Sequence, residues 1–353
     1  MKNIQPFQVK PSTNTFGKRK TRLILLITMA TLLGISGCIE KMPEAAAQPQ
    51  QSELQPATQS QQPSVTPELE TEPAAEFSEQ MIFNDLAYAS ASPAQILDLY
   101  VPAGTGPFPL VIIIHSGGFM TGDKTDGSEK NKIKVLLKEG FAAASINYRL
   151  SGEAIFPAQV FDAKTAVRYL RANSKEYNLD SNRFGAWGSS AGGTLVSLLG
   201  VTCNVADLEG SDLGNPEQSS CIQAAVDWFG LVDLLKMEEQ FAGTECPGGF
   251  NNPDSAESKW VGAPIQTVPQ LVSRTNPMNY IDADDPPFLI QHGSKDCRVP
   301  PVQSKAFADA LTAVIGDSKV IFTELPGAGH GGGGFKTDAN LELVINFLNS
   351  NLK

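Results

Sequence analysis

The sequence predicts an α/β fold in which a mostly parallel sheet is covered by helices on both faces. Short apolar segments rich in branched residues alternate with amphipathic helical segments along residues 81–353. These residues number 353 − 80 = 273, which is enough to bury one large core. Parallel strands need crossover connections, and helical crossovers cover both faces of the sheet.

The expected elements follow one another in this alternating order. The strands are expected at Ile96–Val101, Leu110–Ile114, Ala142–Asn147, Arg183–Gly188, Ala224–Phe229, Phe288–Gln291 and Lys319–Leu325. The helices are expected at Glu129–Lys138, Pro157–Tyr177, Ala191–Gly200, Pro301–Val314 and Ala339–Asn349. Ligands of such sheets bind beyond the carboxyl ends of the strands, so functional residues are sought there.

Residues 231–285 interrupt the alternation with many Pro, Gly and Asn and with scattered large apolar side chains. One interpretation is an inserted cap over the functional site, because long irregular segments are often functional. The other is an irregular excursion that does not touch a ligand. The sequence leaves both open.

The N-terminus resembles an export signal. A basic region that contains Lys18, Arg19, Lys20 and Arg22 precedes an apolar run of 13 residues, Leu23–Ile35. That run is shorter than the roughly 20 residues that span a bilayer. Its end, Ile35-Ser36-Gly37-Cys38, resembles the bacterial lipobox, in which the cysteine is lipid-modified and becomes the mature N-terminus. We therefore expect residues 1–37 to be a lipoprotein-type signal peptide, with an ordinary signal peptide as the alternative.

Lipidation at Cys38 would anchor an exported protein to a bacterial membrane, facing the periplasm or the cell surface. Residues 38–80 are rich in Gln, Pro, Ala, Ser and Glu, and Phe77 is their only aromatic residue. Such a segment buries too little apolar surface to offset the entropy of ordering it. We expect it to be a disordered tether between that lipid and the folded domain.

The charge of the chain argues against nucleic acid as a partner. The chain has 27 basic and 38 acidic residues, and six of the basic ones lie in residues 1–37. The remainder has 27 − 6 = 21 basic and 38 acidic residues, a net charge of −17. Binding to phosphates requires clustered basic charge.

Four cysteines follow Cys38, and an even number in an exported protein suggests disulfides. Four cysteines allow three connectivities. We favour Cys203–Cys221, which would close a polar loop, together with Cys246–Cys297. Four buried free thiols are the alternative. No metal site is expected, because neither CxxC nor HxxxH spacing occurs.

The motif Gly188-Ser189-Ser190-Ala191-Gly192 lies between an expected strand and an expected helix. A G-x-S-x-G serine in this context sits on a tight turn that raises its oxygen above the sheet. The flanking glycines allow close approach of neighbouring backbone, and their register selects Ser190 over Ser189. Ser190 is therefore the expected nucleophile of acyl transfer.

A glycine-rich loop, His115-Ser116-Gly117-Gly118-Phe119, follows the early strand Leu110–Ile114. Acyl transfer needs backbone N–H groups aimed at the oxyanion. We expect Gly118 and Gly117 to supply them, and the N–H of Ala191 to complete the oxyanion hole. His115 precedes this loop and is interpreted as a residue that braces it.

An acid and a base follow the last two strands, in the order Ser, Asp, His that this type of site uses. Asp296 lies just beyond Phe288–Gln291, and His330 lies just beyond Lys319–Leu325. His330 is the expected base and Asp296 the carboxylate that orients it. Of the other two histidines, His292 is interpreted as structural. The alternative acids fit a strand end less well; they are Asp233, Asp282, Asp284 and Asp285.

The chain resembles bacterial α/β-hydrolases of the esterase/lipase group related to hormone-sensitive lipase, especially the feruloyl-esterase-like BD-FAE branch. The matching stretches are IIIHSGGFMTGDK, FPAQVFDAKTAVRYLRAN, GAWGSSAGG, AAVDWFG, DDPPFLIQHGSKDCRVP and PGAGHG. The resemblance implies an α/β-hydrolase fold with catalytic roles at Ser190, Asp296 and His330 and oxyanion roles at Gly117 and Gly118. Ser116 departs from the glycine of many relatives. Three further matching positions are interpreted as scaffold ion pairs and turn residues; they are Asp162, Arg168 and Asp227.

These observations predict a serine hydrolase that cleaves carboxylic esters through an acyl-enzyme, without a metal or organic cofactor. Its substrate is expected to be a small-molecule ester or an ester linked to a polysaccharide, and the sequence leaves its oligomeric state open. A peptidase of the prolyl type shares the order of the triad, but such relatives usually carry a large extra domain. A third possibility is a lipid-tethered binding module without turnover, although such proteins usually lack one triad residue.

The lipobox interpretation predicts that Cys38→Ser abolishes membrane attachment, because the lipid is attached through this cysteine. Labelling with radioactive palmitate and fractionation of the membranes check this result. Full palmitate labelling of the variant would show that the lipid is attached elsewhere.

Overall fold

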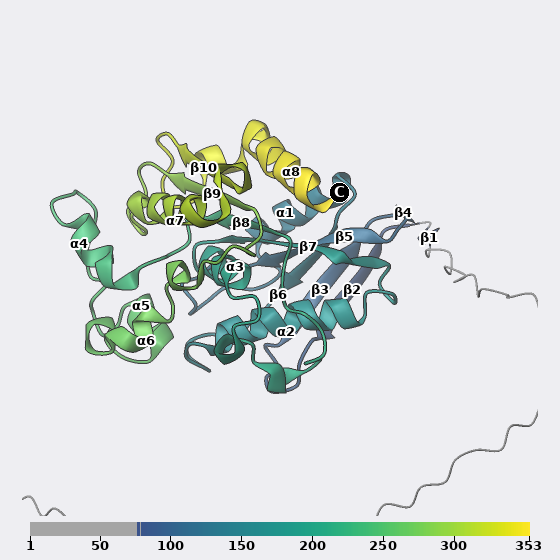
Figure 1. Ribbon diagram of the computed structural model, residues 1–353, viewed down its shortest axis with the longest axis horizontal. Helices are drawn as coiled ribbons and strands as arrows, with labels where there is room; N and C mark the ends of the chain where they lie inside the picture. Colours follow the sequence, from purple (N-terminus) through teal and green to yellow (C-terminus); the bar gives the residue numbers. More distant parts are fainter. Residues whose placement is uncertain (1–75, 78) are drawn as a thin grey trace, which may run out of the picture. The chain divides into compact units, whose positions relative to one another are not determined.

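The computed structural model describes residues 76–77 and 79–353, so the expected signal peptide, Cys38 and nearly all of the expected tether lie outside the described residues. Its main sheet has eight strands in the order β10-β9-β8-β7-β5-β6-β3-β2 (Figure 1). The strands are β2 (Met81–Ala87), β3 (Ile96–Val101), β5 (Phe108–Ile114), β6 (Ala142–Ile146), β7 (Leu179–Ser189), β8 (Ala224–Trp228), β9 (Phe288–Gly293) and β10 (Val320–Leu325). Two short strands, β1 (Glu76–Phe77) and β4 (Gly104–Thr105), pair separately.

The six strands from β6 to β10 along the sheet pair in parallel, whereas β3 is antiparallel to both β6 and β2. This arrangement confirms the predicted mostly parallel sheet. The main helices are α1 (Gly127–Lys138), α2 (Ala158–Ala172), α3 (Ala191–Val201), α7 (Pro301–Ile315) and α8 (Asp338–Leu352). Helices α2, α3 and α7 pack on one face of the sheet and α1 and α8 on the other.

The alternation of side chains along β5 explains why both faces need a helical cover. Leu110, Ile112 and Ile114 belong to the core beneath α2, α3 and α7. Val111 and Ile113 belong to the second core beneath α1 and α8. All five are completely buried, as expected for a central parallel strand whose every residue is apolar.

The structure differs from the sequence prediction mainly at element ends. Strand β2 was not predicted, because most of its residues are exposed and a register shift between Phe83 and Leu86 breaks the period of two. Helix α2 ends at Ala172 rather than Tyr177, and the Tyr177 ring packs against Phe83 of β2. Strand β7 starts at Leu179, four residues before the predicted Arg183, and three of these four residues are polar.

The segment 231–285 folds into short helices, of which α4, α5 and α6 lie at the left of Figure 1. Its helices are η3 (Leu234–Lys236), α4 (Met237–Phe241), α5 (Ala256–Val261), η4 (Ile265–Thr267), α6 (Pro269–Ser273) and η5 (Pro277–Tyr280). Trp260 of α5 anchors the segment, since its ring stacks on Phe119 with centroids 3.8 Å apart and its N–H donates to Gln159 at 3.0 Å.

Among residues 79–353 no helix is long and apolar enough to cross a membrane.

Both predicted disulfides are present. Cys203 pairs with Cys221 across 18 positions and closes a loop after α3. Cys246 pairs with Cys297 across 51 positions and ties the segment 231–285 to the loop after β9. Because Cys297 follows Asp296 directly, this second bridge restrains the position of that carboxylate.

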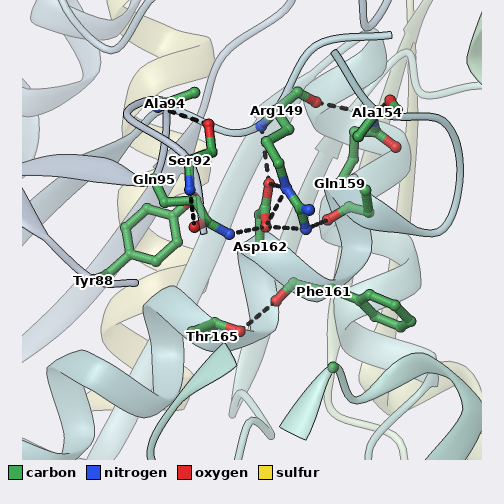
Figure 2. Close-up of polar contacts among 12 residues, drawn as sticks. Tyr88, Ser92, Ala94, Gln95, Arg149, Ala154, Gln159, Phe161, Asp162 and Thr165 are labelled. Carbon is green, nitrogen blue, oxygen red and sulfur yellow. Dashed lines mark hydrogen bonds and ion pairs between the residues drawn. The ribbon is translucent and has the colours of Figure 1, made fainter. Parts of the chain in front are cut away.

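Asp162 of α2 is the centre of a buried polar network that joins three parts of the chain (Figure 2). Its carboxylate accepts two bonds from the side chain of Arg149 at 2.7 and 2.9 Å and one from the Arg149 backbone N–H at 2.9 Å. The amide of Gln95, in the β2–β3 connection, donates to the same carboxylate at 2.7 Å. The side chain of Asp162 is fully buried and that of Arg149 is 16% exposed.

Arg168, one turn and a half further along α2, secures the loop closed by the first disulfide. Its guanidinium donates to the carbonyls of Glu209, Gly210 and Gly214 and pairs with the Glu209 carboxylate at 3.4 Å. The structure therefore confirms that Asp162 and Arg168 form scaffold ion pairs.

Replacing the buried carboxylate, as in Asp162→Ala, leaves the guanidinium of Arg149 without its partner. We expect the free energy of unfolding to fall by about 3–5 kcal/mol, the usual cost of breaking a buried pair from one side. Urea denaturation followed by circular dichroism measures this change.

The exposed pair Lys305–Asp309, at 2.6 Å, offers a matched control. Asp309→Ala is expected to cost about 0.5 kcal/mol or less, because solvent screens this pair. Equal losses for the two variants would contradict the role assigned to Asp162.

Candidate active site

Ser190 occupies the single residue between the end of β7 at Ser189 and the start of α3 at Ala191. Its backbone has φ 55° and ψ −122°, a conformation that non-glycine residues rarely adopt. The Ser190 N–H donates to the carbonyl of Trp228 at 2.8 Å, and the Ser190 carbonyl accepts from Thr194 at 2.9 Å. The turn is therefore held from both sides, by β8 and by the first turn of α3.

The two glycines of the serine motif are required by close backbone contacts. A Cβ on Gly188 would lie 2.1 Å from the carbonyl oxygen of Gly192. A Cβ on Gly192 would lie 2.1 Å from the carbonyl oxygen of Ile114, at the end of β5. Neither residue can carry a side chain unless the turn moves, which gives the G-x-S-x-G pattern its physical reason.

The structure brings Ser190, His330 and Asp296 together, although they are distant in the sequence. Nε2 of His330 lies 2.9 Å from Oγ of Ser190, and Nδ1 of His330 lies 2.7 Å from Oδ2 of Asp296. The Asp296 side chain is fully buried, whereas that of His330 is 21% exposed. A proton on Nδ1 that bonds to Asp296 leaves Nε2 as an acceptor facing the serine hydroxyl.

Asp296 is held as a carboxylate by donors from several directions. Its Oδ1 accepts from the backbone N–H groups of Arg298 at 2.7 Å and Val299 at 3.0 Å. Its Oδ2 lies 3.2 Å from Nε2 of His292, as well as 2.7 Å from His330. Burial by itself would raise the pKa of Asp296, but the bonds to His292 and His330 hold it well below its usual range.

Phe229 is a site residue that the sequence did not reveal. Its ring packs against the imidazole of His330 with centroids 4.7 Å apart and against Phe335 at the same separation. Phe229 has a positive φ of 46°, and its N–H donates to the carbonyl of Gln291 at 2.8 Å. This aromatic contact limits the orientations of the imidazole.

The glycine loop after β5 has a tightly turned backbone. Gly117, Gly118 and Phe119 all have positive φ, at 114°, 60° and 62°. The carbonyl of Gly117 accepts from the N–H groups of Met120 and Thr121, both at 3.1 Å. In the described part of the chain, no acceptor pairs with the N–H groups of the three predicted oxyanion donors, which are Gly117, Gly118 and Ala191.

Ser116, the predicted departure from many relatives, braces the serine turn. Its hydroxyl donates to the carbonyl of Ser189 at 2.9 Å.

A buried ion pair also contacts the serine turn. The side chain of Ser189 accepts from Nζ of Lys132 at 3.1 Å, and Lys132 pairs with Glu129 at 2.9 Å. Both members of this ion pair are buried, which the sequence analysis missed. The spacing of Glu129, Lys132 and Leu136 along α1 could have placed these charges on its buried face.

The other two histidines lie away from the serine oxygen. His115 is buried and stacks on Tyr148 at 4.3 Å, and burial lowers the pKa of its imidazole. His292 is buried beside Asp296, and its Nδ1 lies 2.7 Å from the hydroxyl of Ser304. The alternative acids are used locally: Asp233 caps η3 and Asp285 accepts from the backbone N–H of Asp282.

Asp227 lies in β8 rather than in a turn, and its side chain holds the turn that follows this strand. Its carboxylate accepts from Ser197 at 2.7 Å and from the backbone N–H of Gly230 at 2.8 Å. The bonds join α3 to the turn after β8, which carries Phe229.

Ser190 and His330 open into a pocket of about 870 Å³. Its apolar lining includes Phe119, Trp228, Phe229 and Phe335. The segment 231–285 contributes three lining residues, Leu231, Ala256 and Glu257. Burial raises the pKa of the Glu257 carboxyl. The arrangement can activate a hydroxyl beside an aromatic pocket that takes a drug-sized molecule.

Comparison with known proteins agrees with this geometry. A model of the BD-FAE family matches residues 97–311. Over 73% of this chain, the sequence is 32% identical to Esterase LipC of Mycobacterium tuberculosis, of which 62% is covered. Over 70% of this chain it is 30% identical to the Probable carboxylic ester hydrolase LipM of the same organism, of which 55% is covered. The chain thus spans about three fifths or less of the length of these curated relatives.

Two solved structures are also similar to this chain. A bifunctional GH43-CE protein of Bacteroides eggerthii is 33% identical, with a TM-score of 0.70 over 77% of this chain and 35% of that protein. A truncated carbohydrate esterase from gut microbiota is 32% identical, with a TM-score of 0.70 over 79% of this chain and 99% of that one.

The geometry of the glycine loop predicts that Gly117→Ala impairs the site. A Cβ there would lie 1.9 Å from the carbonyl oxygen of Thr121, and the φ of 114° disfavours any side chain. We expect the loop to shift and the covalent labelling of Ser190 by a fluorophosphonate to slow by about a hundredfold, as when an oxyanion donor is lost.

Gly152→Ala is the control, because nothing lies within 4 Å of a Cβ at that exposed position. Both variants are checked for folding by their thermal melting curves. Unchanged labelling of a folded Gly117→Ala protein would show that this loop does not shape the site.

Proposed function

This chain belongs to the BD-FAE family of α/β-hydrolases, and from that premise we propose that it hydrolyses carboxylic esters through an acyl-enzyme formed on Ser190. One observation carries the proposal. The hydroxyl of Ser190, the imidazole of His330 and the carboxylate of Asp296 are joined at 2.9 and 2.7 Å, and the hydroxyl faces a pocket large enough for an ester.

In the first half of the reaction, Oγ of Ser190 attacks the ester carbonyl and its proton moves to Nε2 of His330. The imidazolium that forms is stabilised by Asp296, whose carboxylate is already ionised and buried. The oxyanion accepts bonds from the N–H groups of Gly118 and Ala191, and the N-terminus of α3 adds positive potential. His330 then protonates the leaving alkoxide.

In the second half, water takes the place of the alcohol. His330 removes a proton from this water, which attacks the acyl carbonyl through the same oxyanion hole. Return of the proton to Ser190 releases the acid and restores the enzyme. The contact of Phe229 with the imidazole keeps Nε2 aimed at the serine through both halves.

We further propose that the ester is carried on a carbohydrate. Two similar structures, both above 30% identity, are named for a carbohydrate esterase or for a bifunctional GH43-CE protein. The segment 231–285 supports this proposal, because it places Glu257, a hydrogen-bonding group suited to sugar hydroxyls, in the pocket lining. This class includes acetyl and hydroxycinnamoyl esters of polysaccharides.

The proposed place of this reaction is outside the cytoplasm, with the domain tethered by a lipid on Cys38. The two disulfides support export, because such bonds form and persist in oxidising compartments. The N-terminal sequence pattern supports the lipid anchor.

The role of Ser190 predicts that Ser190→Ala lowers kcat/KM for p-nitrophenyl acetate by about 10⁴-fold or more, because the covalent route is lost. Ser350→Ala, an exposed change on α8, is expected to retain full activity. Near-normal turnover by Ser190→Ala would exclude Ser190 as the nucleophile.

A panel of p-nitrophenyl, hydroxycinnamoyl and peptide substrates, assayed side by side, separates the ester hydrolase from a prolyl-type peptidase. Labelling of Ser190 by a fluorophosphonate separates an active enzyme from a binding module without turnover. Absence of both labelling and ester hydrolysis would contradict the proposal.

A further inference from the structure

The active-site pocket is cationic in a domain that is acidic overall. Residues 79–353 contain 20 Lys and Arg (27 in the chain less 7) and 31 Asp and Glu (38 less 7). Five of the 20 cations line this pocket, but only one of the 31 acids does, Glu257. Burial raises the pKa of that acid. The lining cations are Lys132, Lys134, Lys138, Arg298 and Lys336.

Three of these lysines define one wing of the pocket. Lys134 and Lys138 lie four residues apart and therefore on the same face of α1. Lys336, at the end of η7 (Gly333–Lys336), lines the same pocket. We refer to Lys134, Lys138 and Lys336 as the lysine wing.

The lysine wing carries charge that the fold does not neutralise. All three side chains belong to exposed residues, and within residues 79–353 none of them forms an ion pair. Most other lysines of the domain do have a carboxylate partner; examples are Lys124, Lys164 and Lys305. The position of Lys138 in the last turn of α1 suits the helix dipole, but this reason does not extend to Lys134 or Lys336.

Lys132 adds a buried cation at the floor of the same pocket. Its Nζ lies 3.1 Å from Oγ of Ser189, the neighbour of Ser190, and 5.7 Å from the centre of the Trp228 ring. Its partner Glu129 does not line the pocket. The ammonium of this ion pair thus lies beside the serine turn, and the unpaired Lys134 and Lys138 lie further along α1.

A cleft that is lined by one sign of charge and walled by apolar groups focuses its field on ligands of the opposite sign. We propose that the lysine wing binds an anionic group of the substrate, so that the preferred esters carry such a group on the acyl or on the alcohol part. This inference rests on the proposed ester hydrolysis and adds the charge of its substrate. An ester of an acidic polysaccharide or a half ester of a dicarboxylic acid has the required chemistry.

The test compares two pairs of esters that differ only by a carboxylate against a carboxamide. The acyl pair is mono-p-nitrophenyl adipate and its adipamate, and the alcohol pair is 4-carboxyphenyl acetate and 4-carbamoylphenyl acetate. For at least one pair we expect kcat/KM to be about tenfold higher for the carboxylate at low salt. The preference should fall as the salt concentration rises to about 1 M, because salt screens exposed charges. The pair that shows it identifies the part of the substrate that bears the charge.

Variants show which lysines cause the preference for the carboxylate ester. The triple variant Lys134→Gln, Lys138→Gln, Lys336→Gln is expected to bring the carboxylate-to-carboxamide ratio close to one. The matched control is Lys130→Gln, Lys175→Gln, Lys305→Gln, which changes the net charge equally at exposed lysines that do not line the pocket. The control should keep the wild-type ratio. A ratio near one in the wild type for both pairs, or an equal loss in both triple variants, would overturn the inference.

A binding measurement separates this inference from the proposed hydrolysis. Isothermal titration calorimetry of the Ser190→Ala protein with the same pairs reports affinity without turnover. A tighter carboxylate complex that weakens in the lysine-wing variant, together with no Ser190-dependent hydrolysis, would support the anion site and refute the ester hydrolase. Ser190-dependent hydrolysis without any carboxylate preference in rate or affinity would refute only the anion site.

Discussion

Ser190 keeps a backbone conformation that a non-glycine residue holds only when its surroundings leave no alternative. Gly188 and Gly192 allow the carbonyls of neighbouring elements to approach to distances that a Cβ would not permit. The Ser190 N–H is fixed to β8, and the Ser189 carbonyl is fixed to Ser116 beyond β5. The turn therefore depends on three adjacent parallel strands, and through them on the two apolar cores that cover the sheet. Its strain is balanced by the packing of the whole domain.

The partners of Ser190 are placed by separate restraints. Asp296 receives two backbone N–H bonds and stands beside His292, while the neighbouring Cys297 is joined to Cys246. His330 rests on Phe229, whose own backbone is tied to β9. Each restraint acts on a strand end or on the loop that follows it. A small movement at this edge of the sheet can thus change the distances from the Ser190 hydroxyl to the His330 imidazole and from the imidazole to the Asp296 carboxylate. All three groups lie at that edge.

The charge around the site is opposite in sign to the net charge of the domain. The body of the protein is acidic, and its buried cations are mostly paired with carboxylates, as Lys164 and Arg168 are with Glu209. In the pocket the positive charges dominate, and Lys132 stands directly beside the serine turn. The buried pair of Lys132 and Glu129 serves the turn through Ser189, while the lysine wing faces solvent. The same helix, α1, therefore contributes both to the support of the nucleophile and to the electrostatic character of the pocket.

The sequence by itself determined the strand and helix alternation, the serine turn and the identities of Ser190, Asp296 and His330 as candidate residues. These follow from local rules: apolar periodicity, glycines that permit close approach, and polar residues just beyond strand ends. It also favoured the two cysteine pairs, but it left the other connectivities open. It did not indicate strand β2 or the early start of β7, because their residues lack a clear period. Phe229 against His330, His292 beside Asp296, the contact of Lys132 with Ser189 and the lysine wing were decided only by the tertiary structure. Each depends on side chains from different elements meeting in space, and no spacing along one element records such a meeting.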